Sequence, residues 1–286
     1  MPEMIKESKY KNILSIIGKA AVYLIMIIFT FMTLYPIFWL IMNSFKTTRE
    51  FQISQLALPK SPTLQNYKGA WEIGDFSLLF PNSILYTLGA TLGIIFLSLL
   101  AGFAFAKLKS KATKPIYNSF IMGILLTTQT LMIPLFLEVN LLGIYNTRFA
   151  VLLVYIGAGL PIGIYLSTEY IRAIPSAVVE SARIDGAGFF RIFLSIIMPM
   201  SVPVATTLAI LNITNTWNEF ALINILVSKT ELKSLPLGIY KFSGSLSSDY
   251  GKQFAALTIG MIPMLVFYMI FRKQITKGVA AGAIKG

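Results

Sequence analysis

Six long apolar runs divide this chain, and each is long enough to cross the hydrocarbon core of a membrane as a helix. A transmembrane helix needs about 20 predominantly apolar residues to cross roughly 30 Å of hydrocarbon. The runs cover approximately residues 16–42, 83–106, 116–137, 149–168, 201–227 and 254–271. We therefore predict an all-α polytopic membrane protein, with six transmembrane helices in a single domain over residues 1–286.

The composition agrees with a lipid environment and excludes several other classes of protein. Hydrophobic residues make up 56% of the chain and charged residues only 13%, and the mean hydropathy is +0.72, which is far above that of a water-soluble domain. The first run is too long for a signal-peptide core and no small-residue cleavage site follows it, so we expect it to remain as an uncleaved span. With no Cys and no His, the chain lacks thiol nucleophiles, imidazole bases and the commonest zinc ligands. We expect no metal site and no catalytic residues.

The net charge of +12 follows membrane topology rather than nucleic-acid binding. A nucleic-acid binder gathers its basic residues on one water-soluble face, whereas here they lie in short clusters between the apolar runs. Fifteen of the 24 Lys and Arg residues fall in one alternate set of segments, namely 1–15 with the edge residue Lys19, 107–115, 169–200 and 272–286. The other set holds the remaining nine although it is longer, and it comprises 43–82, 138–148 and 228–253. Since Lys and Arg concentrate on the cytoplasmic side, we predict that both termini, the loop 169–200 and the tail 272–286 are cytoplasmic.

The third run has a polar centre that a lipid-facing helix would not carry. Thr127, Thr128, Gln129 and Thr130 follow one another there, and Pro134 comes one turn later. Such residues are tolerated inside a membrane where neighbouring helices or water satisfy their polar groups. We expect this part of the chain to face protein or a cavity.

The connection between the fourth and fifth runs has the pattern of two short helices joined by a tight turn. Pro175 suits a first helical position and Gly186 suits a helix end. After the turn, apolar residues recur at helical spacing, at Phe189, Ile192, Phe193 and Ile196. We predict a structured arm whose second helix lies on the membrane surface or against a partner.

This connection resembles the cytoplasmic signature of import-type ABC transporter permeases. In that family the signature reads Glu-Ala-Ala, three residues, Gly, nine residues, Ile, one residue and Leu-Pro. The corresponding residues here are Glu180-Ser181-Ala182, Gly186, Ile196 and Met198-Pro199. Two positions depart from the pattern, because Ser181 stands for Ala and Met198 for Leu, and both replacements are small or apolar.

Three further stretches narrow the resemblance to carbohydrate permeases of the maltose type. They are Ile184-Asp185-Gly186-Ala187 in the loop, Trp217-Asn218-Glu219-Phe220 in the fifth run and the tail Lys277–Gly286. The tail looks like the C-terminus of the smaller, six-span partner of that type. The resemblance covers most of the chain, and the motifs occur in the expected order.

The resemblance implies a membrane-spanning permease subunit of an ATP-driven importer for sugars, with oligosaccharides as the expected class. Such a subunit forms half of the translocation pathway and is not itself an enzyme. The implied partners are a second permease subunit in a heterodimer, two ATP-binding subunits and an extracytoplasmic solute-binding protein. The chain is expected to bind no cofactor, with ATP and Mg²⁺ held by the ATP-binding subunits. The implied location is the cytoplasmic, or inner, membrane of a bacterium or archaeon.

The resemblance also implies a role for the loop in mechanical coupling. In the family, the short helix of the loop sits in a cleft on the ATP-binding subunit and transmits nucleotide-driven movement to the spans. The residues that would make this contact are Glu180, Ser181, Ala182, Arg183, Asp185 and Gly186. The alternative is that Glu180 and Arg183 form only a solvated pair on a helix.

The tail after Phe271 is rich in Gly and Ala, and we expect a flexible end because it has too little apolar bulk to fold alone. By resemblance it reaches between the two ATP-binding subunits. The residues expected to contact them are Gly278, Gly282, Lys285 and Gly286. A frayed terminus without a partner is the alternative.

Four polar residues of the fifth run recur at i, i+3, i+4 and i+7 and would form one stripe on a helix, namely Asn212, Asn215, Thr216 and Glu219. An ionisable residue at membrane depth is costly unless it is paired or hydrated, so the stripe should not face lipid. Along a sugar pathway, neutral amides and hydroxyls could exchange hydrogen bonds with sugar hydroxyls. Packing of the stripe against the partner permease is an equal alternative.

Two other classes of membrane protein fit the sequence less well. A secondary transporter or channel, for sugar or for another small polar solute, is expected to carry more ionisable groups in its spans than the single acidic candidate Glu219. A membrane enzyme is disfavoured by the absence of His, Cys and paired carboxylates in the predicted spans. The sequence also has no Gly-rich phosphate-binding loop followed by Lys and Ser or Thr, which leaves nucleotide binding to a partner.

Overall fold

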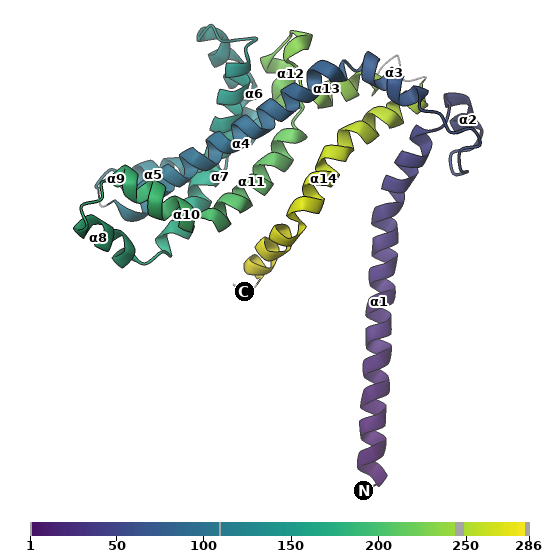
Figure 1. The fold of residues 1–286 in the computed structure, drawn as a ribbon, viewed down its shortest axis with the longest axis horizontal. Coiled ribbons are helices and arrows are strands. Elements are labelled where there is room, and N and C mark those ends of the chain that lie inside the picture. Colours follow the sequence, from purple (N-terminus) through teal and green to yellow (C-terminus); the bar gives the residue numbers. More distant parts are fainter. Residues whose placement is uncertain (1, 109, 244–248, 284–286) are drawn as a thin grey trace. The chain divides into compact units, whose positions relative to one another are not determined.

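The computed structural model describes residues 2–108, 110–243 and 249–283, and the side chains within 16–108, 110–242 and 249–274 (Figure 1). The chain folds into two compact units. The smaller unit comprises Met1–Ala70 and Ser245–Ile259, and the larger one comprises Trp71–Gly244 and Gly260–Gly286. The larger unit carries both the loop 169–200 and the polar part of the fifth run.

All regular structure among the described residues is helical. Four helices are long and apolar enough to cross a membrane, namely α1 (Pro2–Ser44), α4 (Phe76–Lys107), α7 (Arg148–Arg172) and α14 (Tyr250–Ala283). Two bent pairs also pass this test, namely α5 (Thr113–Gly123) with α6 (Thr128–Leu141), bent by 107°, and Phe189–Met200 with α11 (Val202–Trp217), bent by 74°. The predicted all-α polytopic fold is confirmed. The third and fifth predicted spans are interrupted: the third bends between α5 and α6, and the helix of the fifth ends at Trp217, before the predicted end at residue 227.

Helices α4 and α7 pack against each other through small residues. At Gly102 of α4, an added Cβ would lie 2.7 Å from the Cβ of Ser167 and 3.0 Å from the backbone nitrogen of Thr168. At Gly163 of α7, an added Cβ would lie 2.1 Å from the hydroxyl oxygen of Ser98. Each helix thus has two small residues separated by three others at the contact, which is the spacing that lets transmembrane backbones approach closely.

The two helices run in the same direction. Near their ends, Lys107 Nζ donates to the carbonyl of Ile174 at 2.5 Å, and near their beginnings Arg148 donates to Asn82 Oδ1 at 3.1 Å. The chain between them, α5 and α6, must therefore return from one end of the pair to the other. The bend of 107° thus interrupts a segment that crosses the same depth as its neighbours.

A fourth crossing in the larger unit lies antiparallel to α4. It consists of α9 (Phe189–Ile192), the π-helical turn η1 (Phe193–Ile197), α10 (Met198–Met200) and α11. Its first part contacts the C-terminal end of α4, where the rings of Phe189 and Phe103 lie 4.8 Å apart. At its far end, the ring of Trp217 lies 5.8 Å from that of Phe80 in the first turns of α4.

The short elements cap the two ends of these crossings. α8 (Ser176–Ile184) lies with α9 at one end, and α12 (Ala221–Leu226) lies with α6 at the other (Figure 1). The chain then continues through η2 (Thr230–Leu232), α13 (Leu235–Tyr240) and η3 (Lys241–Ser243). This segment is held against α4, because Tyr86 donates to the carbonyl of Leu232 at 2.8 Å and Ser83 Oγ accepts from the amide of Leu235 at 2.7 Å.

The smaller unit joins the end of α1 to the beginning of α14, with α2 (Thr48–Ile53) and α3 (Gln65–Ile73) in the connection. Asn66 Nδ2 donates to the carbonyls of Ser44 and Lys46 at 2.8 and 2.7 Å. The ring of Phe254 lies 5.2 Å from that of Trp39. No residue in the most apolar stretch of α1 is buried, so this helix presents its apolar surface to lipid or to another chain.

The close contact of α4 with α7 makes Gly102 sensitive to a small enlargement. We predict that Gly102→Ala lowers the melting temperature of the detergent-solubilised protein, because the added methyl group has no room beside Ser167 and overpacking of this kind costs about 1–3 kcal/mol. Gly157→Ala is the matched control, because an added Cβ there meets nothing within 4 Å. Both changes place Ala inside a helix and gain the same helix propensity. Equal melting temperatures for the two variants would contradict the tight contact.

Candidate functional site

The predicted coupling loop contains a short helix that ends in a glycine turn. α8 begins after Pro175, and beyond its end Gly186 has φ +79°, in the left-handed region that favours glycine. The amide of Ala187 donates to the carbonyl of Ala182 at 2.9 Å, and the amide of Gly186 donates to the carbonyl of Arg183 at 3.0 Å. These two bonds form a Schellman motif, which satisfies carbonyls at the end of the helix and reverses the chain. The expected pair of helices joined by a turn is confirmed.

One face of α8 is anchored in the chain's own core, and the other face is exposed. Val179 and Ala182 are buried in a cluster with residues of α4, α7 and α9. The exposed face carries the other predicted coupling residues, namely Glu180, Ser181, Arg183, Asp185 and Gly186. Ala182 therefore packs inward, where its small side chain lets α8 approach the crossings. The other five residues are accessible to a second protein.

The exposed face of α8 combines unpaired charges with apolar side chains. Within the described side chains, neither Glu180 nor Arg183 has an ion-pair partner, so the pair considered between them is absent. Ile184 and Phe190 are 86% and 67% exposed beside them. Exposed apolar side chains rimmed by charged ones are typical of a surface that meets a partner.

The apolar stripe after the turn packs against the chain itself. Ile192 and Phe193 are 1% and 0% exposed, and the ring of Phe193 lies 6.2 Å from that of Phe103 in α4. The expectation that this stripe lies on the membrane surface or on a partner is wrong, because it belongs to the same buried cluster as the inner face of α8. The stripe thereby ties α8 to the crossings.

A polar pocket lies where the two interrupted crossings meet. Its volume is ≈ 390 Å³, and its polar lining comes from the start of α6 and from the end of α11 and the residues after it, namely Thr128, Gln129, Thr214, Asn215, Asn218 and Glu219. The expectation that the polar centre of the third run faces a cavity is confirmed for Thr128 and Gln129, whereas Thr127 and Thr130 are exposed outside this pocket. Interrupted helices that surround a pocket with polar groups are a recurrent way of building a solute pathway through a membrane.

Glu219 lies outside the helix on which we expected it. α11 ends at Trp217, and the Glu219 carboxylate accepts hydrogen bonds from the amides of Leu222 and Ile223 at 2.6 and 3.1 Å. It also accepts from the hydroxyl of Tyr155 at 2.5 Å. A carboxylate at this place satisfies amides in the first turn of α12 that have no partner within that helix. The predicted continuous stripe is therefore wrong at Glu219, because the helix stops before it.

Of the four residues predicted to line the pathway, the structure brings two to this pocket. Asn215 is exposed there, and Glu219 forms part of the wall. Asn212 is buried, and its side chain donates to the carbonyl of Leu208 one turn back on α11 at 2.8 Å. Thr216 is half-buried and does not line the pocket.

Sequence reasoning missed three residues at this site. Thr214 and Asn218 belong to the same polar run as Asn215 and could have been found by including every polar residue near the end of the fifth run. Tyr155 lies on a different crossing, and only its hydrogen bond to Glu219 in the folded chain identifies it.

The capping role of Glu219 can be tested through stability. We predict that Glu219→Ala lowers the melting temperature, because leaving buried hydrogen-bonding groups without a partner costs about 1–3 kcal/mol. Glu219→Gln keeps one acceptor oxygen and should melt between the wild type and the Ala variant. Asn215→Ala is the matched control, since this side chain lines the same pocket and has no hydrogen-bond partner among the described residues. If the two Ala variants melted at the same temperature, the capping role would be untenable.

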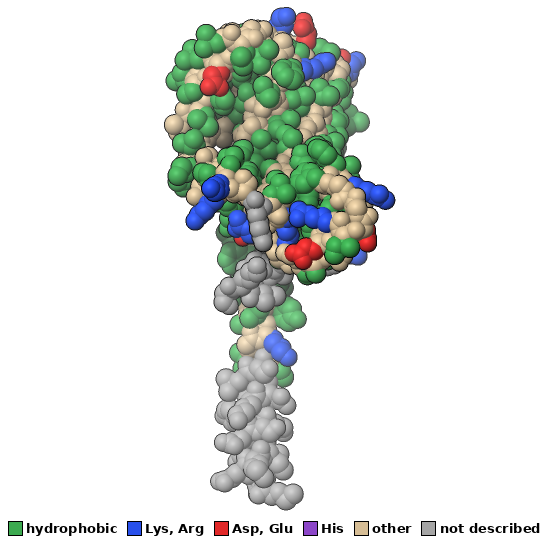
Figure 2. All heavy atoms as spheres, turned by 90° about the vertical axis from the view of Figure 1, so that its left-hand side faces the viewer, with side chains coloured by type: hydrophobic (Ala, Val, Ile, Leu, Met, Phe, Trp, Pro, Cys, Tyr) green, Lys and Arg blue, Asp and Glu red, His purple; other side chains and the backbone are tan. Residues whose placement is uncertain are grey.

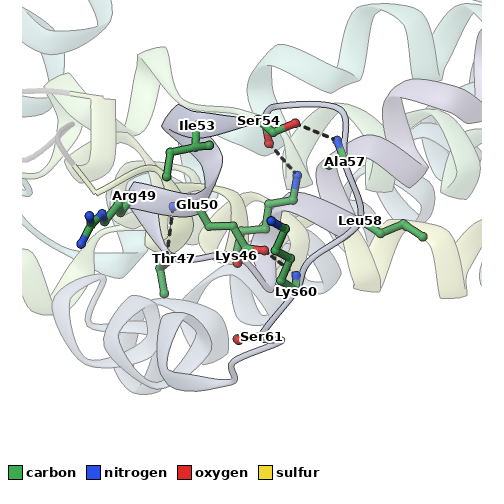
Figure 3. A pocket seen from close by; sticks show the side chains of 10 residues that line it. All are labelled: Lys46, Thr47, Arg49, Glu50, Ile53, Ser54, Ala57, Leu58, Lys60 and Ser61. Carbon is green, nitrogen blue, oxygen red and sulfur yellow. Dashed lines mark hydrogen bonds between the residues drawn. The ribbon is translucent and has the colours of Figure 1, made fainter.

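A second pocket, in the smaller unit, is built around the side chain of Lys46 (Figure 3). Lys46 is 0% exposed, and its Nζ donates to the carbonyls of Ser54 and Gln55 at 3.1 and 3.5 Å. Burial lowers the pKa of this ammonium below its ordinary value, and the nearby Glu50 carboxylate opposes the shift. Because the ammonium already binds the loop, we assign Lys46 to holding residues 47–61 near the end of α1.

The C-terminal residues predicted to contact the ATP-binding subunits are only partly described. α14 continues through Ala283, so Gly278 and Gly282 lie in a helix where we expected a flexible end. Lys285 and Gly286 lie outside the described residues. In the part of the chain whose structure is described, no cluster of three or more acidic side chains is placed to hold a metal ion.

Comparison with known proteins points to one family. Residues 94–280 match the family described as binding-protein-dependent transport system inner membrane component. The multiple sugar-binding transport system permease protein MsmG of Streptococcus mutans is 31% identical over 267 residues, which cover 92% of this chain and 96% of that protein. The melibiose/raffinose/stachyose import permease protein MelC of Bacillus subtilis is 27% identical over 252 residues, which cover 88% of this chain and 91% of that protein.

A solved structure shares the fold. The crystal structure of a bacterial ABC transporter involved in the import of the acidic polysaccharide alginate contains a chain that aligns with a TM-score of 0.80 and 21% identity, over 90% of this chain and 96% of that chain. The residues matched by the family include both the glycine turn after α8 and the polar pocket around Glu219. This chain therefore belongs to the binding-protein-dependent ABC transporter permeases, the inner membrane components of such transport systems.

Proposed function

We propose that this chain is one of two membrane-spanning subunits of an ATP-driven importer for sugars, with oligosaccharides as the substrate class. Its relatives MsmG and MelC are named for sugar transport. The observation that carries the proposal is the exposed, charged face of α8, whose opposite face is packed on α4 and α7. A helix held in this way can receive movement from a separate ATP-binding subunit and pass it to the crossings.

The polar pocket suits a neutral solute that is rich in hydroxyl groups. Its lining offers amides and hydroxyls, which donate and accept hydrogen bonds as sugar hydroxyls do. The one carboxylate, Glu219, is already engaged with Tyr155 and with the first turn of α12. We infer that this pocket belongs to the half of the pathway that this chain contributes, and that a second permease subunit in a heterodimer supplies the other half.

Both termini are assigned to the cytoplasm. The chain is a multi-pass protein of the inner membrane, and six crossings would bring its two ends to the same side. The end of α4 and α7 that carries α8 also holds Lys107, Lys111 and Lys114. Since Lys and Arg accumulate on the cytoplasmic side, we assign this end, the loop 169–200 and the tail 272–286 to the cytoplasm.

The chain acts with partners and has no catalytic role of its own. ATP is hydrolysed by separate subunits, and we infer that two of them hold the nucleotide and Mg²⁺, one of them against α8. A solute-binding protein would deliver the sugar from the opposite side of the membrane. The tail is assigned to contacts with the ATP-binding subunits through Gly278, Gly282, Lys285 and Gly286.

The glycine turn allows a test in which local packing does not change. We predict that Gly186→Ala lowers sugar uptake by the assembled transporter, since a non-glycine residue in the left-handed conformation costs about 1–2 kcal/mol and would disturb the end of α8. Gly188→Ala is the matched control, because Gly188 has an ordinary φ of −72° and an added Cβ meets nothing within 4 Å at either position. Uptake is measured in cells that contain equal amounts of each variant. No loss at Gly186, or an equal loss at Gly188, would count against the role of the turn.

The transport assignment itself is tested by copurification and uptake. We predict that the tagged chain copurifies with a second permease and an ATP-binding subunit, and that deleting its gene abolishes ATP-dependent uptake of at least one radiolabelled oligosaccharide. A secondary transporter would need neither subunit. Uptake into vesicles by the purified chain alone, driven by an ion gradient without ATP, would refute the proposal.

A further inference from the structure

A third pocket lies at the end of α4, α5 and α7 that carries α8. Its volume is ≈ 470 Å³, and its polar lining consists of Ser110, Thr113, Lys114, Tyr117, Asn118 and Arg172. The pocket sits at the level where the crossings finish, because α4 ends at Lys107 and α7 ends at Arg172. It is separate from the pocket at Glu219, which lies toward the opposite ends of the same helices.

The surroundings of this pocket are strongly basic. The described lysines of the segment are Lys107, Lys111 and Lys114, and Arg172 enters from α7. The carboxylate in contact with this cluster, Glu169, is already shared, because its Oε1 accepts from Arg172 at 2.6 Å and from Tyr117 at 2.9 Å. Lys114 has no acidic partner among the described residues. The pocket therefore presents positive charge that the chain itself does not neutralise.

Four contacts hold the wall of the pocket in place. The guanidinium carbon of Arg172 lies 5.0 Å from the centre of the buried Tyr117 ring, and Glu169 is hydrogen-bonded to both residues. Lys107 Nζ joins the end of α4 to the carbonyl of Ile174, just beyond α7. A wall that is already ordered reduces the entropy cost of binding a ligand.

Apolar side chains are also exposed on α5 and α7, the helices that carry most of this lining. They include Ile116 and Met122 of α5 and Tyr165 of α7. Figure 2 shows several Lys and Arg side chains, with a few Asp and Glu side chains among them, along the lower edge of a largely hydrophobic face. A ligand that binds the cations of the pocket and extends along α5 and α7 would meet exposed apolar side chains, which matches an anionic headgroup that carries acyl chains.

We propose that this pocket binds the phosphate of an anionic phospholipid, whose acyl chains lie along α5 and α7. The membrane topology of a protein depends on how many Lys and Arg residues lie on each side, and not on whether they form a pocket. Topology alone therefore does not account for basic residues that line a concave site. Here Lys114 and Arg172 come from different helices and meet at a pocket that also offers hydroxyl and amide donors. Basic pockets between transmembrane helices on the cytoplasmic side are suited to phospholipid headgroups. The inference goes beyond transport and concerns how the complex is held in its membrane.

The test uses the assembled transporter, delipidated in detergent without ATP or sugar. It is titrated with phosphatidylglycerol or phosphatidylcholine, and the bound lipids are counted by native mass spectrometry. We expect phosphatidylglycerol to bind more tightly, and Lys114→Gln to weaken its binding about fivefold, the loss expected for one basic residue at an anionic surface. Lys111→Gln is the matched control, since it removes one charge from the same segment but Lys111 does not line the pocket.

Four results would overturn the proposal. Equal losses in the two variants would show that charge acts only through the general surface potential. Equal binding of phosphatidylcholine would remove the preference for an anionic headgroup. Displacement of the lipid by inorganic phosphate at the same concentration would point to a site for a free anion, and no lipid binding in the full assembly would show that another subunit covers the pocket. Because the assay measures binding and not transport, its failure leaves the importer assignment standing.

Discussion

The contact between α4 and α7 is the constraint on which the rest of the larger unit depends. Inside a membrane no hydrophobic force draws two apolar helices together, so close packing of small residues and polar contacts must do so. Gly102 and Gly163 let the two backbones approach, and hydrogen bonds from Lys107 and Arg148 join the two ends. Because α4 and α7 run in the same direction, the chain crosses back between them through α5 and α6. It crosses back again after α7 through α9 to α11. α8 and the basic pocket lie at one end of the pair, and the polar pocket lies toward the other.

The two breaks beside the polar pocket, before α6 and after α11, are capped by side chains. Thr127 accepts from the amide of Thr130 at the start of α6, and Glu219 accepts from the amide of Leu222 at the start of α12. Backbone groups left open at membrane depth are costly unless protein or water satisfies them, so these caps are a condition for the breaks. The breaks in turn bring polar side chains from two crossings to one pocket.

The features that could be predicted from the sequence are those with a local signal. The lengths of the apolar runs indicate the crossings, and Gly186 marks a helix end because it readily adopts a positive φ. The end of α11 before Glu219 could not be predicted, because the spacing from Asn212 onward is compatible with a continuous helix. The break depends on hydrogen bonds from α12 and from Tyr155, which lies far away in the sequence. The surface that the apolar stripe from Phe189 contacts could not be predicted either. The same apolar spacing fits a helix that faces lipid, a partner or the core of its own chain.

The anchoring of α8 determines how force can travel through this protein. Its inner face is packed on the crossings, and its glycine turn leads directly into a second buried segment. The exposed face of α8 is therefore separated from α4 and α7 only by packed side chains. In the proposed importer, a force on α8 would therefore act directly on the packed cluster that joins it to α4 and α7. The movement that α8 could transmit would then depend on how tightly this cluster packs. A cavity in the cluster would let α8 move without moving α4 and α7.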